Sequence, residues 1–200
     1  MQCRSCLMAA LMTLTLGTLA GCGDDGSPSE RSAAKERKSL DVTLKLAEGG
    51  SAGSASLTET EGGLEVRARV RGLEPGFHGF HVHEAGVCDP DAREDGERAP
   101  FSSAMGHLVG EGVEHGAHAG DLPTLLVRKE GTAILTAVTD RLRLADVRDQ
   151  DGSALMVHAM RDNQANIPER YKSEGEAGPD AETLATGDSG DRAACGVIKP

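Results

Sequence analysis

The chain has 200 residues, a hydrophobic content of 38%, a mean hydropathy of −0.34 and a formal net charge of −11. These values are typical of one soluble domain with appendages, and an acidic chain lacks the basic surface that nucleic-acid binding requires. Aromatic residues make up only 2%, so the core must be aliphatic, and 26 glycines favour strands and turns over helices.

The first 21 residues have the features of an export signal. Arg4 gives a thin positive start, and the apolar run over 7–20 is too short to span a bilayer comfortably. The run ends in Leu-Ala-Gly-Cys at 19–22, which resembles the lipobox of bacterial lipoproteins. This likeness implies a lipid anchor at Cys22 in the cell envelope, on the periplasmic or outer-membrane face. The alternative is an ordinary secretory signal with an incidental cysteine.

Residues 22–39 are rich in Gly, Ser, Pro and charged side chains and show no apolar period. This composition indicates a flexible tether. We therefore expect a single folded domain over residues 40–200.

Beyond the tether, short segments with alternating apolar and polar residues indicate strands. The alternation is clearest over 64–71, which is typical of a half-buried antiparallel strand. Tight turns early in the chain and two long loops later predict an all-β fold, an eight-stranded antiparallel Greek-key sandwich or flattened barrel with an immunoglobulin-like architecture. The expected strands are 42–46, 52–58, 64–71, 76–84, 122–127, 132–138, 154–158 and 193–198, and the loops are 85–121 and 159–192.

One expected strand has the sequence GFHGFHVHE and contains three histidines. Side chains alternate along a strand, so His81 and His83 share one face, about 7 Å apart at the backbone. Both can therefore turn toward one metal ion. His78 has the parity of Phe80 and Val82, so we expect it to face the core.

The loop 85–121 is long for a compact domain, and such loops are usually functional or disordered. It carries three more histidines and a carboxylate, so we interpret it as ordered by a metal. These residues are His107, His115, His118 and Asp121, and a seventh histidine, His158, ends an apolar run.

Together these motifs resemble the copper/zinc superoxide dismutase family over about residues 40–198. The resemblance implies copper and zinc as cofactors and no organic cofactor. Imidazole suits both metals, and three nitrogens with one carboxylate suit a closed, tetrahedral zinc site. The implied copper ligands are His81, His83, His107 and His158, and the implied zinc ligands are His107, His115, His118 and Asp121, with His107 bridging.

All seven histidines then have a place, because His78 matches a structural histidine beside the copper strand. Seven unrelated core and surface histidines are the alternative. The implied activity is the conversion of superoxide into dioxygen and hydrogen peroxide. His107 would deliver a proton, and Arg192 would attract and orient the superoxide anion. Alternatively, Arg192 pairs with Asp188 or Asp191, and Lys172 either adds to the positive field or is an ordinary surface lysine.

The resemblance also implies a support for the ligands and a cross-link. Asp162 would join a copper ligand to a zinc ligand through hydrogen bonds, unless it is a plain loop carboxylate. Cys88 and Cys195 would form a disulfide, as expected of an exported chain, with two free thiols as the alternative.

Two features depart from the family pattern. The turn after His107 lacks the usual Asn-Pro pair, and only two residues separate His115 from His118. Two other functions remain open, a lipid-anchored module that buffers copper and a structural envelope domain without activity. The sequence leaves the oligomeric state open, with a homodimer as one possibility.

Overall fold

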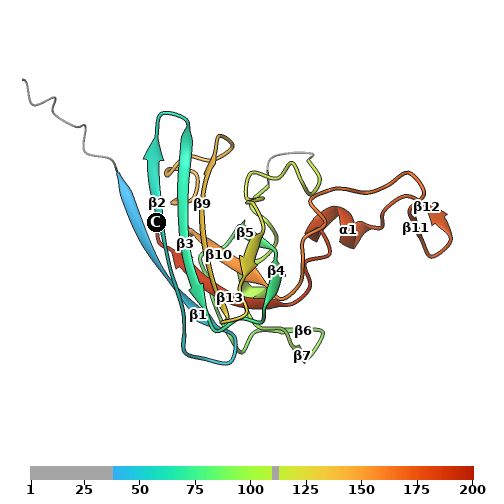
Figure 1. Ribbon diagram of the computed structural model, residues 1–200, viewed down its shortest axis with the longest axis horizontal. Coiled ribbons are helices and arrows are strands. Elements are labelled where there is room, and N and C mark those ends of the chain that lie inside the picture. The colour runs from blue at the N-terminus through green and yellow to red at the C-terminus, as the bar shows by residue number, and fades with distance from the viewer. Residues whose placement is uncertain (1–37, 110–112) are drawn as a thin grey trace, which may run out of the picture. The chain divides into compact units, whose positions relative to one another are not determined.

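The computed structural model describes residues 38–109 and 113–200 (Figure 1). The expected signal peptide at 1–21, the lipidation site Cys22 and the tether as far as residue 37 lie outside the described residues. In the part of the chain that is described, no helix combines the length and apolar character needed to cross a membrane.

Seven strands form one antiparallel sheet in the order β5-β10-β13-β1-β2-β3-β9. A separate pair, β4 with β8, stands where the sheet curls round, because β4 leads directly into β5 and a tight turn joins β8 to β9. Figure 1 shows this curl. The structure confirms the all-β antiparallel prediction. The bounds are β1 (Ser39–Leu46), β2 (Ser51–Thr60), β3 (Gly63–Arg71), β4 (Gly76–His78), β5 (Phe80–His83), β8 (Leu125–Val127), β9 (Thr132–Thr139), β10 (Ser153–His158) and β13 (Arg192–Ile198).

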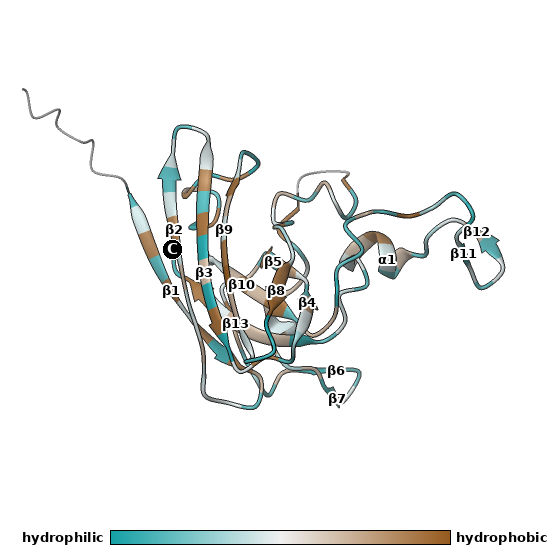
Figure 2. Cartoon of the chain, in the orientation of Figure 1, coloured by the Kyte–Doolittle hydropathy of each residue, from teal (hydrophilic) through white to brown (hydrophobic). Residues whose placement is uncertain are grey.

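The strands form where the apolar pattern has a period of two. Along β3, Leu64, Val66, Ala68 and Val70 are buried while the arginines between them are exposed, and Figure 2 shows the same banding. β5 and β10 differ, because every residue in both strands is buried. The two strands that carry histidines therefore lie inside the domain, where packing fixes their side chains.

The core has two parts that share β10 and β13. Leu155 and Val157 pack with the main aliphatic cluster inside the curled sheet, together with Phe80 from β5. Met156 points to the other face and packs with Phe101 from the long loop. A strand covered on both faces is a rigid base for ligands, and His158 is its last residue.

The histidine strand expected over 76–84 is divided at Gly79. Its first part pairs with β8 and its second part with β10. The Gly79 amide donates to the carbonyl of Met160 at 2.8 Å, and a Cβ at Gly79 would lie 2.5 Å from Oγ of Ser189. The chain therefore bends at a glycine that the 159–192 loop approaches closely.

Both long loops contain short elements that we did not predict. The first holds β6 (Arg93–Glu94), β7 (Glu97–Arg98) and the 3₁₀ turn η1 (Ser102–Ala104). The second holds β11 (Lys172–Ser173), β12 (Glu176–Ala177) and the helix α1 (Ala181–Thr186). Capping defines α1, because Asp180 accepts from the Thr183 amide at 2.9 Å and Gly187 ends the helix with φ of 63°.

Candidate metal centre

β5 positions the centre, because the long loop binds its free edge. The Val82 amide donates to the carbonyl of Gly120 at 2.9 Å, and the Leu108 amide donates to the carbonyl of Val82 at 2.7 Å. These bonds bring His107 opposite His83 and Asp121 opposite His81. The opposite edge of β5 pairs with β10, which brings His158.

The first donor set consists of four buried imidazoles. One ring nitrogen from each lies within 4.8 Å of the others, and Nε2 of His83 lies 3.2 Å from Nε2 of His158. In His83 and His158 the other ring nitrogen is hydrogen-bonded to the backbone. Nδ1 of His83 donates to Met105 O at 2.8 Å, and Nδ1 of His158 donates to Gly190 O at 2.9 Å. The four residues are His81, His83, His107 and His158.

The second donor set surrounds Oδ1 of Asp121. Nδ1 of His107 lies 3.0 Å from this oxygen, and Nδ1 of His115 and of His118 each lie 3.4 Å from it. Nδ1 of His118 is also 3.4 Å from Nδ1 of His107. A tetrahedral zinc ion with bonds of about 2.0–2.1 Å holds its ligand atoms about 3.3–3.4 Å apart. These four separations are therefore close to those of a zinc site. The group whose donor atoms all lie within 4.8 Å of one another contains His81 instead of His118, together with His107, His115 and Asp121.

Three buried ring nitrogens lack a hydrogen-bond partner among the described residues. They are Nδ1 of His81, Nε2 of His107 and Nδ1 of His115. Buried polar atoms almost always have a partner, so these lone pairs indicate metal ligands. His107 belongs to both sets, because its Nδ1 faces Asp121 and its Nε2 has no protein partner.

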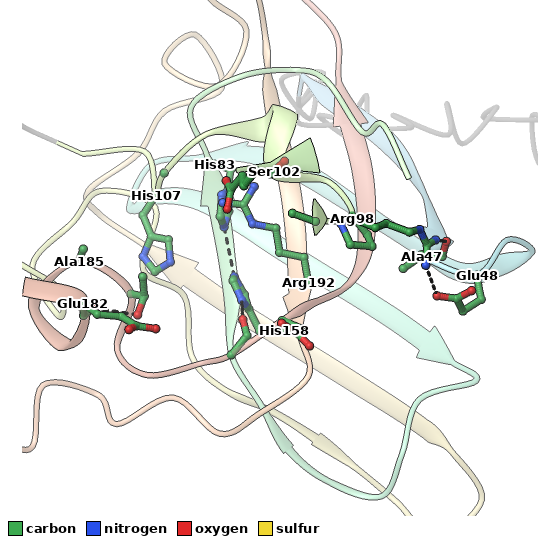
Figure 3. A pocket seen from close by; sticks show the side chains of 17 residues that line it. Ala47, Glu48, His83, Arg98, Ser102, His107, His158, Glu182, Ala185 and Arg192 are labelled. Carbon is green, nitrogen blue, oxygen red and sulfur yellow. Dashed lines mark hydrogen bonds and ion pairs between the residues drawn. The ribbon is translucent and has the colours of Figure 1, made fainter. Parts of the chain in front are cut away.

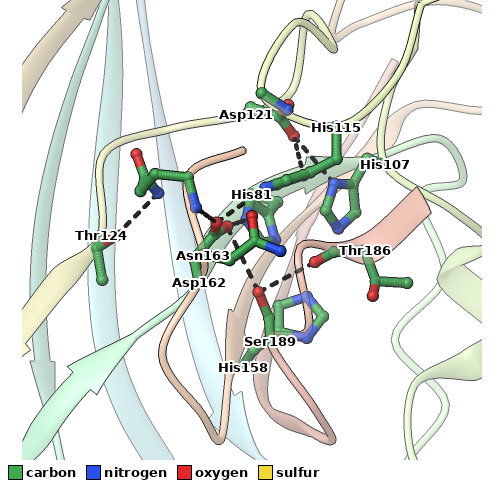
Figure 4. Close-up of polar contacts among 12 residues, drawn as sticks. His81, His107, His115, Asp121, Thr124, His158, Asp162, Asn163, Thr186 and Ser189 are labelled. Carbon is green, nitrogen blue, oxygen red and sulfur yellow. Dashed lines mark hydrogen bonds and ion pairs between the residues drawn. The ribbon is translucent and has the colours of Figure 1, made fainter. Parts of the chain in front are cut away.

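Asp162 connects the two donor sets through contacts of its carboxylate with one histidine of each set (Figure 4). Its Oδ2 lies 2.5 Å from Nε2 of His81, and its Oδ1 lies 2.8 Å from Nε2 of His115. The Gln164 amide also donates to Oδ1 at 2.6 Å. A carboxylate in this position fixes the tautomer and orientation of both rings and leaves each Nδ1 available.

Comparisons with known proteins agree with this geometry. The family model described as copper/zinc superoxide dismutase matches residues 51–198. The chain belongs to the copper/zinc superoxide dismutase family. It is 39% identical to the copper-zinc superoxide dismutase of Mycobacterium bovis over 189 residues, which cover 91% of this chain and 78% of that protein.

Two solved structures are also similar. The copper/zinc superoxide dismutase from Brucella abortus has a TM-score of 0.63 and 31% identity, covering 80% of this chain and 99% of its own. The monomeric copper, zinc superoxide dismutase from Salmonella enterica has a TM-score of 0.61 and 34% identity, covering 81% and 100%.

Burial and hydrogen bonding shift the titration of the dismutase histidines in opposite directions. Burial lowers the pKa of His81 to about 4 and that of His158 to about 3, so both are neutral at pH 7. Burial also disfavours charge on His115, but its interactions with the carboxylates of Asp121 and Asp162 outweigh this and raise its pKa to about 9. Zinc must therefore displace a proton from His115.

The two carboxylates stay ionised at neutral pH. Burial alone would raise the pKa of Asp121, but its interactions with His107 and His115 hold the pKa well below the usual range. The same balance, with hydrogen bonds from His115 and His81, holds the pKa of Asp162 well below its ordinary value. Two permanent negative charges thus lie beside the imidazoles, which favours cations in the centre.

The first donor set opens into a cavity of about 640 Å³ (Figure 3). Arg192 lies at its wall, where Nη1 donates to Phe101 O at 2.5 Å and Nη2 donates to Met105 O at 2.6 Å. Neither acidic neighbour that we considered, Asp188 or Asp191, has an ion pair with this guanidinium among the described residues. The charged residues of the wall are Arg98, Arg192, Glu48, Glu94, Glu182 and Asp191.

The structure confirms the disulfide between Cys88 and Cys195. It ties the loop that carries Phe101 and Met105 to β13, three residues beyond Arg192. His78 is buried, and its two ring nitrogens lie 2.7 Å from His158 O and 2.8 Å from Glu74 O. Lys172 is exposed on β11 and does not line the cavity, so it is a surface lysine.

The sequence reasoning missed the backbone carbonyls that hold the functional side chains. Met105 O accepts hydrogen bonds from both His83 and Arg192. Phe101 O accepts one from Arg192, and Gly190 O accepts one from His158. Met105 and Phe101 adopt positive φ, 63° and 64°, which turns their carbonyls inward. No residue-type pattern reveals such carbonyls, because their partners are 22 or more positions away in sequence.

Proposed function

We propose that this chain is an exported superoxide dismutase that converts superoxide into dioxygen and hydrogen peroxide. The observation that carries this proposal is His107, one imidazole whose two ring nitrogens face two donor sets. A site for storing one metal needs no shared ligand, so we do not favour the copper-buffering module or the inactive structural domain.

The two donor sets support one metal each. The first set, His81, His83, His107 and His158, would hold copper, and the second, His107, His115, His118 and Asp121, would hold zinc. When bound, copper supplies one-electron redox chemistry and zinc supplies a fixed charge that orders the loop. His78 and Asp162 would support the rings from outside the two sets.

Arg192 would bind the substrate. The cavity wall carries four carboxylates, so an anion entering the cavity meets unfavourable charge unless a cation stands next to the copper set. Burial lowers the pKa of Arg192, yet a guanidinium remains charged throughout the neutral range. Two carbonyls hold it in one orientation, and its remaining N–H groups can donate to superoxide.

His107 would supply a proton. Its Nε2 lies in the first set, and its Nδ1 is held at 3.0 Å from Asp121. The ring can therefore take up a proton at Nε2 without rotating and pass it to a reduced dioxygen species in the cavity. Peroxide formation needs two protons, and the second would come from solvent in the cavity.

The regions outside the described residues complete the proposal. We propose a signal peptide at 1–21, a tether at 22–39 that is acylated at Cys22, and a catalytic domain at 40–200. The chain would then be anchored in the bacterial envelope, facing the periplasm or the outer surface. Mass spectrometry of the purified protein tests this, because cleavage before Cys22 with added acyl mass is expected, and an unmodified N-terminus would overturn it.

We also propose a homodimer. Phe77 on β4 and Leu126 on β8 are cross-strand partners, and both side chains are about half exposed, at 50% and 57%. Such a pair supports contact with a second copy. The Salmonella enterica relative is titled monomeric, so the mass of this protein must be measured by sedimentation equilibrium. A monomeric mass at micromolar concentration would overturn this part of the proposal.

The activity is tested with the full chain loaded with copper and zinc, next to a His107→Ala variant. We expect rapid, cyanide-sensitive dismutation by the parent protein and a large loss in the variant. Tight copper binding without dismutation by the parent protein would instead support the copper-buffering module.

A further inference from the structure

The turn that carries two of the proposed zinc ligands is unusually compact. His115 and His118 are separated only by Gly116 and Ala117, and Asp121 follows three residues later. Gly116 has φ of 88°, and a Cβ there would lie 2.4 Å from Cβ of Ala165. So short a turn makes few hydrogen bonds of its own, and other groups must fix its peptide planes.

Asp121 fixes the turn from the inside. Its Oδ1 faces the three zinc-set imidazoles, and its Oδ2 accepts from the Gly116 amide at 2.6 Å and the His118 amide at 3.1 Å. One oxygen of this carboxylate is thus a proposed zinc ligand, and the other accepts hydrogen bonds from two backbone N–H groups. These bonds orient the amide sides of the two peptides.

Arg141 fixes the same two residues from the outside. Its Nη1 donates to the carbonyl of Gly116 at 2.9 Å and to the carbonyl of His118 at 3.3 Å. Arg141 follows the end of β9, where its own amide donates to Oγ1 of Thr139 at 3.2 Å. The turn is therefore fastened to the edge of the main sheet.

The two sets of contacts are complementary. Gly116 and His118 each give their N–H to Asp121 and their C=O to Arg141. A residue with both backbone groups fixed cannot rotate its peptide planes, so the Cα–Cβ direction of His118 is fixed as well. The two separations of 3.4 Å that Nδ1 of His118 makes, with Oδ1 of Asp121 and with Nδ1 of His107, depend on that direction.

We propose that Arg141 is a positioning residue for the zinc set, which clamps the shortened ligand turn and holds its donor atoms at tetrahedral spacing before zinc arrives. This inference rests on the proposed function, because it takes His107, His115, His118 and Asp121 as the zinc ligands. It assigns Arg141 no contact with the metal or the substrate. The guanidinium of Arg141, which lies at the edge of the main sheet, would thus maintain the geometry of the shortened loop.

The test compares Arg141→Gln and Arg141→Lys with Arg143→Gln in the full chain. Arg143 is exposed in the same loop, and within the described part of the chain its side chain makes only a 4.0 Å ion pair, with Glu59, so its substitution changes charge equally. Metal-depleted protein is titrated with zinc against a chromogenic chelator, and the absorption of Co²⁺ bound in place of zinc reports ligand geometry.

We expect Arg141→Gln to weaken zinc binding by about 10-fold, the lower end of the effect of removing a supporting partner. Its Co²⁺ absorption should also lose tetrahedral intensity. Arg141→Lys keeps the charge and one donor position, so its zinc affinity should lie between those of Arg141→Gln and the parent. If Arg141→Gln does not fold, the zinc affinity of Arg141→Lys provides the test. Arg143→Gln should match the parent, and copper affinity measured in the absence of zinc should stay constant in all variants.

Parent-like zinc affinity and Co²⁺ absorption in both Arg141 variants would overturn the inference. An equal loss in Arg143→Gln would also overturn it, because general charge would then explain the effect. Failure of the proposed zinc set would look different. In that case the parent protein would bind no zinc, or its zinc binding would persist in a His118→Ala variant.

Discussion

The carbonyl oxygen of Met105 accepts a hydrogen bond from Nη2 of Arg192 at 2.6 Å. The same oxygen accepts from Nδ1 of His83 at 2.8 Å. One peptide group thus orients both a proposed copper ligand and the proposed substrate-binding cation. Met105 has φ of 63° and ψ of −152°, a region of backbone conformation that is almost exclusive to glycine.

Replacing Met105 with Gly should therefore stabilise the protein. Strain of this kind costs on the order of 1–3 kcal/mol, and glycine returns about 0.5–1 kcal/mol through the greater entropy of the unfolded chain. We expect the free energy of unfolding to rise by about 1 kcal/mol in urea denaturation. Met160→Gly, at a similarly exposed methionine, is the control and should not stabilise. A lower free energy of unfolding for Met105→Gly would contradict the strain argument.

Substituting Arg192 should slow dismutation much more than substituting the other cavity cation. Arg192→Gln removes the charge next to the copper set, and we expect kcat/KM to fall by at least about 10-fold, with weaker dependence on ionic strength. Arg98 lies farther out and pairs with Glu48 at 2.8 Å, so Arg98→Gln is the matched control. Stopped-flow superoxide decay at several salt concentrations measures both, and equal effects would count against the role of Arg192.

The stability of the metal-depleted protein should be greatest near pH 6.5. The pKa values of His81 and His158 fall from 6.5 to about 4 and about 3, so below pH 6.5 the unfolded chain binds more protons and stability declines with falling pH. The pKa of His115 rises to about 9, so its contribution is complete below pH 6.5 and disappears as pH rises through 9.

Urea denaturation of the metal-depleted protein from pH 4 to pH 10 measures both limbs of this curve. Asp162→Asn removes one of the negative charges that raise the pKa of His115, so the alkaline limb should shrink in that variant. A stability that keeps rising from pH 7 to pH 9 would contradict the assignment of charge to His115.

Removing the disulfide should destabilise the fold strongly. Cys88 and Cys195 are 107 residues apart, and in the chain-entropy model a loop of that size contributes about 4–5 kcal/mol. A Cys88→Ser, Cys195→Ser double variant should lose a comparable part of its free energy of unfolding in urea. Because the bond also holds the Met105 loop against β13, kcat/KM should fall under conditions where the variant is fully folded. Unchanged stability and activity would argue against both roles.

Much of the fold could be predicted from the sequence, because a period of two marks strands wherever one face is buried. β3 was found within a residue or so by its alternation of aliphatic and charged residues. The helix α1 was missed, although Asp180 and Gly187 are an ordinary pair of helix caps, because six residues give too little periodicity. The division at Gly79 was also missed, since its cause is the approach of Ser189, a residue 110 positions away.

The candidate site divides in the same way. The histidines and Asp121 could be named because their residue types and order are specific to metal binding. Asp162 could be named as one of their supports, but Arg141 and the Met105 carbonyl could not, because both act through the tertiary position of backbone groups. An arginine at the end of a strand has no local feature that distinguishes a clamp from a solvated side chain.

The shared imidazole of His107 has a consequence for how the centre is filled. Two proposed metal sites that share one ring, and that are also linked through Asp162, would not have independent affinities. If binding of the first metal changes the affinity for the second metal by some factor, binding of the second metal changes the affinity for the first by the same factor. The order of metal loading would then determine the path but not the final state, and a shortage of one metal in the cell would change the affinity of the chain for the other.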